Sequence, residues 1–162
     1  SFYAGGPNSV RSWKARTIGP GSYYRSGIST FDQVGDNQLE LNIEYRFNLI
    51  KVVNAALFAD AGNIWMRRDF EDRDGEDFNV GRFYKELAMG AGIGLRMDFS
   101  FFVIRFDMGI KMHDPIFSDG NRWVVEHLFD KEWKTNWTPS TGTPETSKYS
   151  FYNFNFGIGY PF

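Results

Sequence analysis

Few residues in this chain have the types and spacing that chemistry requires. His113 precedes Asp114 and Glu126 precedes His127, but no activated nucleophile accompanies either pair. We therefore expect no enzymatic activity and no catalytic residue. The two histidines lie too far apart to form a helical pair of metal ligands. The chain has no Cys, which excludes disulfides, zinc ribbons, thiol catalysis and iron–sulfur ligation.

Carboxylates gather in the stretch 66–86 and raise the question of a calcium loop. They are Asp69, Glu71, Asp72, Asp74, Glu76 and Asp77. An EF-hand register anchored on Gly75 puts Phe70 at the first ligand position and Gly81 at the last, so both main ligands are missing. The run is also balanced by cations, namely Arg67, Arg68, Arg73 and Arg82. We predict a solvated surface loop, and we expect neither a metal nor a cofactor.

Composition and charge argue against a nucleic-acid-binding protein and against a membrane protein built of helices. Among 162 residues, 18 Lys and Arg face 20 Asp and Glu, so the net charge of −2 leaves no basic excess for binding nucleic acid. No stretch approaches the roughly 18 consecutive apolar residues of a membrane-spanning helix. The chain opens without the basic and apolar regions of a signal peptide. A membrane β-barrel remains compatible, because its alternating strands average to a polar composition.

Five stretches alternate between apolar and polar residues as strands do. The clearest is 38–49, QLELNIEYRFNL, in which every second residue from Leu39 onward is apolar. Similar alternation indicates strands at 52–65, 87–99, 102–112 and 149–162. All five exceed the roughly 5–6 residues usual in soluble sheets and are long enough to cross a bilayer at a tilt. The polar faces of the first two carry Glu44, Phe58 and Asp60.

The connections between these strands are of two kinds. Those after Leu49 and at 99–101 are short, whereas 66–86 and 113–148 are long and polar. Because outer-membrane barrels have short turns on one side and long loops outside, the pattern predicts an all-β, antiparallel transmembrane barrel segment. A soluble antiparallel sandwich is the alternative. Closed barrels need about eight strands, so we expect a fragment of a larger barrel or an oligomer, and the abrupt start at Ser1 favours a fragment.

Residues 1–37 do not alternate in this way and contain a series of short motifs. These are Gly5-Gly6, Asn8-Ser9, Val10-Arg11-Ser12-Trp13 and Ile18-Gly19-Pro20-Gly21. They resemble the sixth extracellular loop of the BamA superfamily of outer-membrane assembly and secretion barrels, the bacterial surface antigen type, whose loop carries Val-Arg-Gly-Phe. Ser12 and Trp13 stand where that motif has Gly and Phe.

The resemblance continues in the family's order along nearly the whole chain. It includes Glu44-Tyr45, the run Phe58-x-Asp60-x-Gly62 that ends in Trp65, Gly90-x-Gly92-x-Gly94, and a closing stretch at 156–162 similar to the C-terminal β-signal of outer-membrane proteins. It implies that 1–37 is an extracellular loop folded into the barrel lumen. It also implies that 38–162 holds the last five strands of a barrel of about 16, with extracellular loops at 66–86 and 113–148.

The resemblance also implies partners for the loop. In the family, the loop Arg meets an acidic residue on one strand and a Phe-x-Asp on the next. We therefore expect Arg11 to pair with Glu44 and Asp60, and Phe58 to stack on its guanidinium, because a lone Arg inside a barrel is costly to desolvate. The alternative is that the three are unrelated polar-face residues of the lumen.

Two further groups of residues have open interpretations. Gly90, Gly92 and Gly94 all face inward, and they either clear space for the loop or bend the strand. The apolar face of the last strand carries Phe156, Ile158, Tyr160 and Phe162. These residues are expected to face lipid and to be recognised during insertion. In the family this strand pairs weakly with the first barrel strand at a lateral seam.

The resemblance leads to an expected function. We expect a factor in the outer membrane of a Gram-negative bacterium that folds and inserts client β-barrel proteins through the weak seam. Periplasmic POTRA domains and accessory assembly proteins are expected outside this chain. The first alternative is a translocation barrel related to TamA or to two-partner secretion pores. The second is a passive porin or a surface adhesin.

Overall fold

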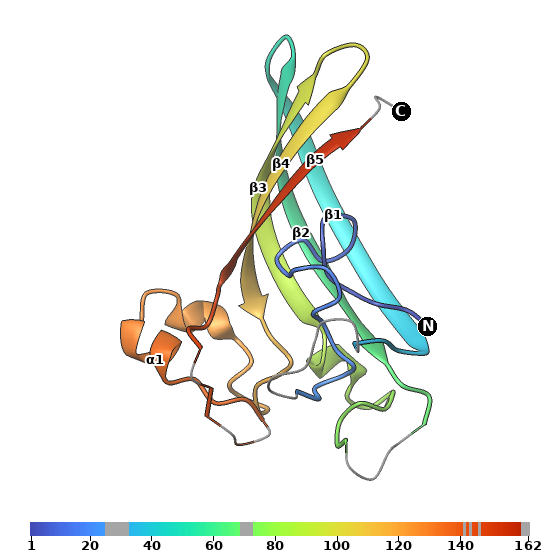
Figure 1. Cartoon of the computed structure of the whole chain (residues 1–162), viewed down its shortest axis with the longest axis vertical. Coiled ribbons are helices and arrows are strands. Elements are labelled where there is room, and N and C mark those ends of the chain that lie inside the picture. The colour runs from blue at the N-terminus through green and yellow to red at the C-terminus, as the bar shows by residue number, and fades with distance from the viewer. Residues whose placement is uncertain (25–32, 69–72, 141, 143, 146, 160–162) are drawn as a thin grey trace.

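The protein is a single curved β-sheet with loops gathered at one end (Figure 1). The computed structural model describes residues 1–24, 33–68, 73–140, 142, 144–145 and 147–159. The strands are β1 (Asn37–Ile50), β2 (Val53–Trp65), β3 (Ala88–Asp98), β4 (Val103–His113) and β5 (Tyr152–Gly159). They are antiparallel and adjacent in chain order. The prediction of an all-β, antiparallel, five-stranded segment is confirmed, and the sheet is not closed.

Helix is confined to short pieces within the loops. These are the 3₁₀ helices η2 (Phe83–Lys85) and η3 (Val124–His127) and the α-helix α1 (Lys131–Thr135). Over the described part of the chain, no helix has the length and apolar character needed to cross a membrane. The described residues also contain no second sheet against which the first packs, as a sandwich requires.

The two faces of the sheet have opposite character. The inner face, on which the N-terminal segment (residues 1–36) lies, carries buried polar residues such as Asp60 and Asp107. The outer face exposes apolar side chains along every strand, including Ile43, Ile93 and Phe154. Because successive strand residues point to opposite faces, the alternation in the sequence produces this division directly. An exposed apolar outer face is the surface that a lipid bilayer covers.

The short and long connections fall at opposite ends of the sheet (Figure 1). The turns from β1 to β2 and from β3 to β4 are tight, and the long loops join β2 to β3 and β4 to β5. The last strand is shorter than its alternation predicts: β5 begins at Tyr152 rather than at position 149. Tyr149 and Phe151 instead pack in a loop core with Phe117, Val124 and Trp137, so the apolar residues there serve the loop and not the sheet.

Candidate functional site

The N-terminal segment reaches the middle of the inner face with its Val-Arg motif, defined as Val10, Arg11, Ser12 and Trp13. All four residues are buried. Gly5 and Gly6 have φ values of 99° and 103°, which an L side chain rarely adopts, and a Cβ on Gly5 would lie 2.4 Å from the Lys14 carbonyl oxygen. These glycines therefore permit the tight return that presents the motif to the sheet. Apolar contacts with β2 and β3 hold it there in a cluster of Ala4, Val10, Trp13, Ile18, Ile64 and Ala88.

Arg11 is the centre of the contacts between this segment and the sheet. Its Nε and Nη2 donate to the two carboxylate oxygens of Asp60, each over 2.8 Å, and its backbone N–H donates to Asp60 Oδ2 over 3.0 Å. Its Nη1 donates to Glu44. The guanidinium carbon lies 3.7 Å from the centre of the Phe58 ring. Planar Arg can meet two carboxylates and an aromatic face at once, which Lys cannot do.

The register of β1 and β2 brings the three strand residues together. Glu44 lies opposite Phe58, and Asn42 lies opposite Asp60, so the four side chains share the inner face across one strand pair. Asn42 Nδ2 donates to Asp60 Oδ1 over 3.0 Å and to the carbonyl of Ser9 over 2.7 Å. The Asp60 side chain has no exposed surface. A carboxylate so enclosed needs a paired cation, because the energy of leaving it ionised and unpaired would be several kcal/mol.

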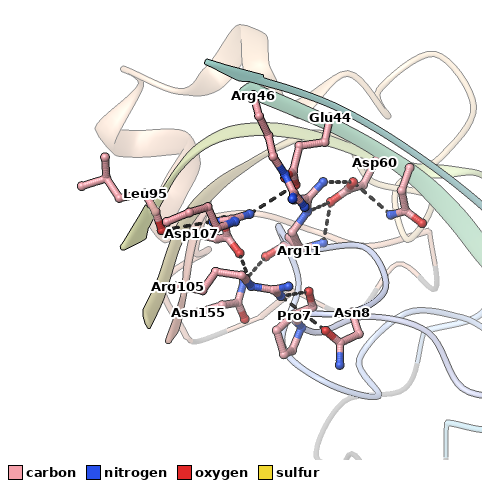
Figure 2. A network of polar contacts seen from close by, with 12 residues as sticks. Pro7, Asn8, Arg11, Glu44, Arg46, Asp60, Leu95, Arg105, Asp107 and Asn155 are labelled. Carbon is pink, nitrogen blue, oxygen red and sulfur yellow. Dashed lines mark hydrogen bonds and ion pairs between the residues drawn. The ribbon is translucent and has the colours of Figure 1, made fainter. Parts of the chain in front are cut away.

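The ion pairs continue from Glu44 across the sheet (Figure 2). Arg96 Nη2 donates to Glu44 over 3.2 Å and its Nη1 to Asp107 over 2.7 Å. Asp107 also pairs with Arg105 at 3.0 Å, and Arg105 donates back to the carbonyl of Pro7 in the N-terminal segment. The segment is therefore held by a network that spans β1 to β4. Our sequence reasoning did not identify these partners, although Arg96, Arg105 and Asp107 stand on the polar side of their strands.

The inward glycines have distinct neighbours. A Cβ on Gly90 would lie 2.1 Å from Ser12 Oγ, so Gly90 clears space for the motif. A Cβ on Gly92 would meet the Phe58 ring at 2.5 Å, and one on Gly94 would meet Asp107 Oδ1 at 2.3 Å. Gly109 on β4 also touches Ser12, with 2.7 Å from a Cβ to Ser12 Cα. Clearing space for the loop, one of the two interpretations of these glycines, applies directly only at Gly90 of the predicted three, whereas Gly92 and Gly94 clear space for residues of the sheet.

β5 contributes two partners of the motif that our sequence reasoning missed. Asn153 Nδ2 donates to the carbonyls of Arg11 and Trp13, each over 2.9 Å, and Asn155 Nδ2 donates to the Arg11 carbonyl over 2.8 Å. The signal in the sequence was the alternation itself, because Asn153 and Asn155 stand between the outward aromatics Tyr152, Phe154 and Phe156.

The residues predicted for the C-terminal seam lie in part outside the described residues. Phe156 and Ile158 are exposed on the outer face of β5, at 58% and 65% of their surface. Tyr160 and Phe162 lie outside the described residues. β5 pairs with β4 along one edge, from Val103 opposite Gly159 to Ile110 opposite Tyr152. Its other edge faces no strand among the described residues.

The polar residues that suggested other chemistry have local structural contacts. His113 Nδ1 lies 2.7 Å from the Leu87 carbonyl, and the His127 ring stacks on Trp133. Asp114 accepts a 2.6 Å hydrogen bond from the Tyr149 hydroxyl. Burial, together with the Asp114 carboxylate, raises the pKa of Tyr149 well above its usual value, so this hydroxyl remains a donor.

The acidic stretch 66–86 is the other part of the sequence that could suggest a metal site. Asp74, Glu76 and Asp77 belong to the loop between β2 and β3, and Asp77 pairs with Arg82. Asp69, Glu71 and Asp72 lie outside the described residues. Among the residues that the structure does describe, no group of three or more His, Asp or Glu side chains is placed to hold a metal ion.

Comparisons with known proteins add the following findings. The Omp85 superfamily domain matches residues 1–162. Over 77 residues the chain is 31% identical to "Outer membrane protein assembly factor BamA" of Neisseria meningitidis serogroup B (strain ATCC BAA-335 / MC58). That match covers 44% of this chain and 10% of the relative, so the chain corresponds to about a tenth of that protein's length. No solved structure matches the chain significantly.

Proposed function

Because this chain belongs to the Omp85 superfamily, we propose that it is part of an outer-membrane barrel that folds and inserts other β-barrel proteins. The family places the chain in the bacterial outer membrane, in a barrel for protein assembly or translocation. Of these two functions, assembly and translocation, we propose assembly. The relative found in Neisseria is named as an assembly factor.

The observation that carries the proposal is the docked Val-Arg motif. Arg11 is bound by Asp60 and Glu44 and covered by Phe58, with three contacts from its side chain and one from its backbone to two adjacent strands. In a passive pore such a segment would occupy part of the inner face that lines the channel and so narrow it. In an assembly factor, the same segment supports the inner wall next to the strand that meets clients.

The physical task of an assembly factor is to lower the barrier for strands that enter lipid. Unpaired backbone groups cost several kcal/mol each in a hydrocarbon environment, so a client strand needs an edge to pair with. In the proposed role, β5 pairs weakly with a first barrel strand and exchanges that partner for a client by strand augmentation. Phe156 and Ile158, which are exposed on the outer face of β5, would then form part of the lipid-facing side of the seam. The reaction needs no nucleotide, metal or covalent chemistry.

A test uses the full-length parent protein in its own cells. The wild-type copy is depleted and replaced by wild type, by Arg11→Ala, or by Arg68→Ala as a control for loss of an exposed arginine in the loop between β2 and β3. We expect Arg11→Ala to lower the amount of folded, heat-modifiable barrel proteins severalfold at normal levels of the parent. The reason is that Asp60 loses its buried cation and the motif leaves the inner face.

Two outcomes would contradict the proposal. If the level of folded barrel proteins stays normal under full depletion, the protein is not a general assembly factor, and a translocation barrel or a surface protein becomes the better interpretation. If Arg68→Ala lowers that level as much as Arg11→Ala, the docked motif is not what matters.

A further inference from the structure

Arg11 connects strands at opposite sides of the sheet. Its side chain binds Asp60 on β2 and Glu44 on β1, while its carbonyl oxygen accepts from Asn153 and Asn155 on β5 (Figure 2 shows the contact with Asn155). β1 and β5 are the first and last strands of the sheet and make no direct pairing with each other. A single residue of the N-terminal segment therefore bridges them.

Asn153 holds the backbone of the motif on both sides of Ser12. Its one amide nitrogen donates to the carbonyls of Arg11 and Trp13, and the side chain is buried, with 9% of the residue exposed. Asn155 adds a second donor to the Arg11 carbonyl. Carbonyl groups enclosed in this way need their donors, because a buried acceptor without a hydrogen bond is destabilising. The motif cannot leave without exposing or orphaning both asparagines.

The inner side of β5 is covered by the motif in its first half and uncovered in its second half. The half with Asn153 and Asn155 is covered by the motif. Toward the end of the strand, a Cβ built on Gly157 or Gly159 would have no atom within 4 Å. The hydrogen bonds that join the side chains of Asn153 and Asn155 to other elements therefore go to the motif. Within the described residues, the one strand that pairs with β5 is β4.

We infer that Asn153 and Asn155 are positioning residues that latch the Val-Arg motif to β5, so that docking of the motif and the position of the seam strand are coupled. When the motif is docked, β5 is tied through Arg11 to β1 and β2. When it leaves, β5 keeps its pairing with β4 but loses this tie to β1 and β2. Coupling of this kind is reciprocal: docking of the motif stabilises the position of β5 by the same free energy by which that position of β5 stabilises docking. The inference deepens the proposed function. It rests on that function because it assumes that β5 is the strand that forms the seam with the first barrel strand.

The test is hydrogen–deuterium exchange on the full-length parent protein in lipid nanodiscs. Asn153→Asp replaces a donor by a charged acceptor facing two carbonyls. We expect the amides of residues 10–13 to exchange at least about tenfold faster, because the loss of a single hydrogen bond already has an effect of about that size. Asn155→Asp is the second variant, on a residue that is less buried. In the opposite direction, Arg11→Ala should speed exchange along 152–159 by a similar factor. Adding Asn153→Asp to Arg11→Ala should produce no further change there.

The control is Asn48→Asp, which changes an asparagine on the inner side of β1 whose contacts are Ile50 and Asn54 and not the motif. Wild-type exchange at residues 10–13 in both Asn153→Asp and Asn155→Asp would overturn the latch. So would unchanged exchange of β5 in Arg11→Ala, or additive effects in the double variant. Because exchange does not report on clients, failure of the latch is distinct from failure of the proposed function, which is measured by folded barrel proteins after depletion.

Discussion

Replacing Asp60 by Ala is expected to release the Val-Arg motif from the inner face while the sheet remains folded. The change removes both carboxylate oxygens that bind the Arg11 guanidinium and the acceptor of the Arg11 backbone N–H. Losing one partner of a buried ion pair costs about 3–5 kcal/mol, because the other charge is left without compensation. Amides of residues 10–13 in the full-length parent should then exchange roughly 10² to 10⁴ times faster.

The same exchange experiment contains its controls. Amides of β3 and β4 should keep their wild-type protection, since their pairing does not involve Asp60. Asp60→Asn, which keeps the shape and removes the charge, should give an intermediate increase. Glu126→Ala, an exposed carboxylate in η3, should change nothing at residues 10–13. If the amides of the motif exchange at the wild-type rate in Asp60→Ala, the ion pair of Arg11 with Asp60 does not hold the motif on the inner face.

Substituting the glycines that contact Ser12 is expected to displace the motif by steric conflict. In Gly90→Ala, the new Cβ would lie 2.1 Å from Ser12 Oγ and 2.5 Å from Ser12 Cβ. In Gly109→Ala it would lie 2.7 Å from Ser12 Cα and 2.9 Å from Ser12 N. Overpacking of this kind costs about 1–3 kcal/mol. Both variants should lower the midpoint of urea unfolding and raise exchange at residues 10–13.

A second change distinguishes the two glycines. Ser12→Gly removes the Cβ and Oγ that Gly90→Ala meets, so it should largely restore that variant. Near the new Cβ of Gly109→Ala it removes Ser12 Oγ, at 2.6 Å, but leaves Ser12 Cα and N, so it should restore the second variant much less. Gly157→Ala is the matched control, because no atom lies within 4 Å of its new Cβ. Equal rescue of both variants, or an equal defect in Gly157→Ala, would contradict the assigned contacts.

Local pattern was sufficient for the strands and their faces. The alternation at 38–49 fixes which side of β1 is apolar, because the side-chain period of a strand is two residues and does not depend on its partners. Turn and loop lengths then order the strands as antiparallel neighbours. By the same reasoning Glu44, Phe58 and Asp60 were placed on one face, and the resemblance of the Val-Arg motif to a known family supplied Arg11 as their partner.

The end of the last strand shows where alternation was insufficient. Tyr149 and Phe151 alternate like strand residues, yet they belong to the core of the loop between β4 and β5, where the Tyr149 and Phe151 rings lie 4.9 Å apart. A short apolar and polar pattern fits both a strand and a packed loop. Which of them forms depends on whether neighbouring aromatics, here Phe117, Trp133 and Trp137, are brought within reach.

By itself the sequence determined the class of fold, the inner and outer faces and the residue types available on each. Only the tertiary structure decided which of the inner polar residues meet. Arg96 on β3 reaches Glu44 on β1 across the intervening strand β2, and Asn155 donates to Arg11 although 144 positions separate them. Alternation fixes the direction of a side chain, but register, sheet curvature and the path of the N-terminal segment fix its neighbours. Those properties arise from the packing of the whole sheet, and no short stretch of the chain contains them.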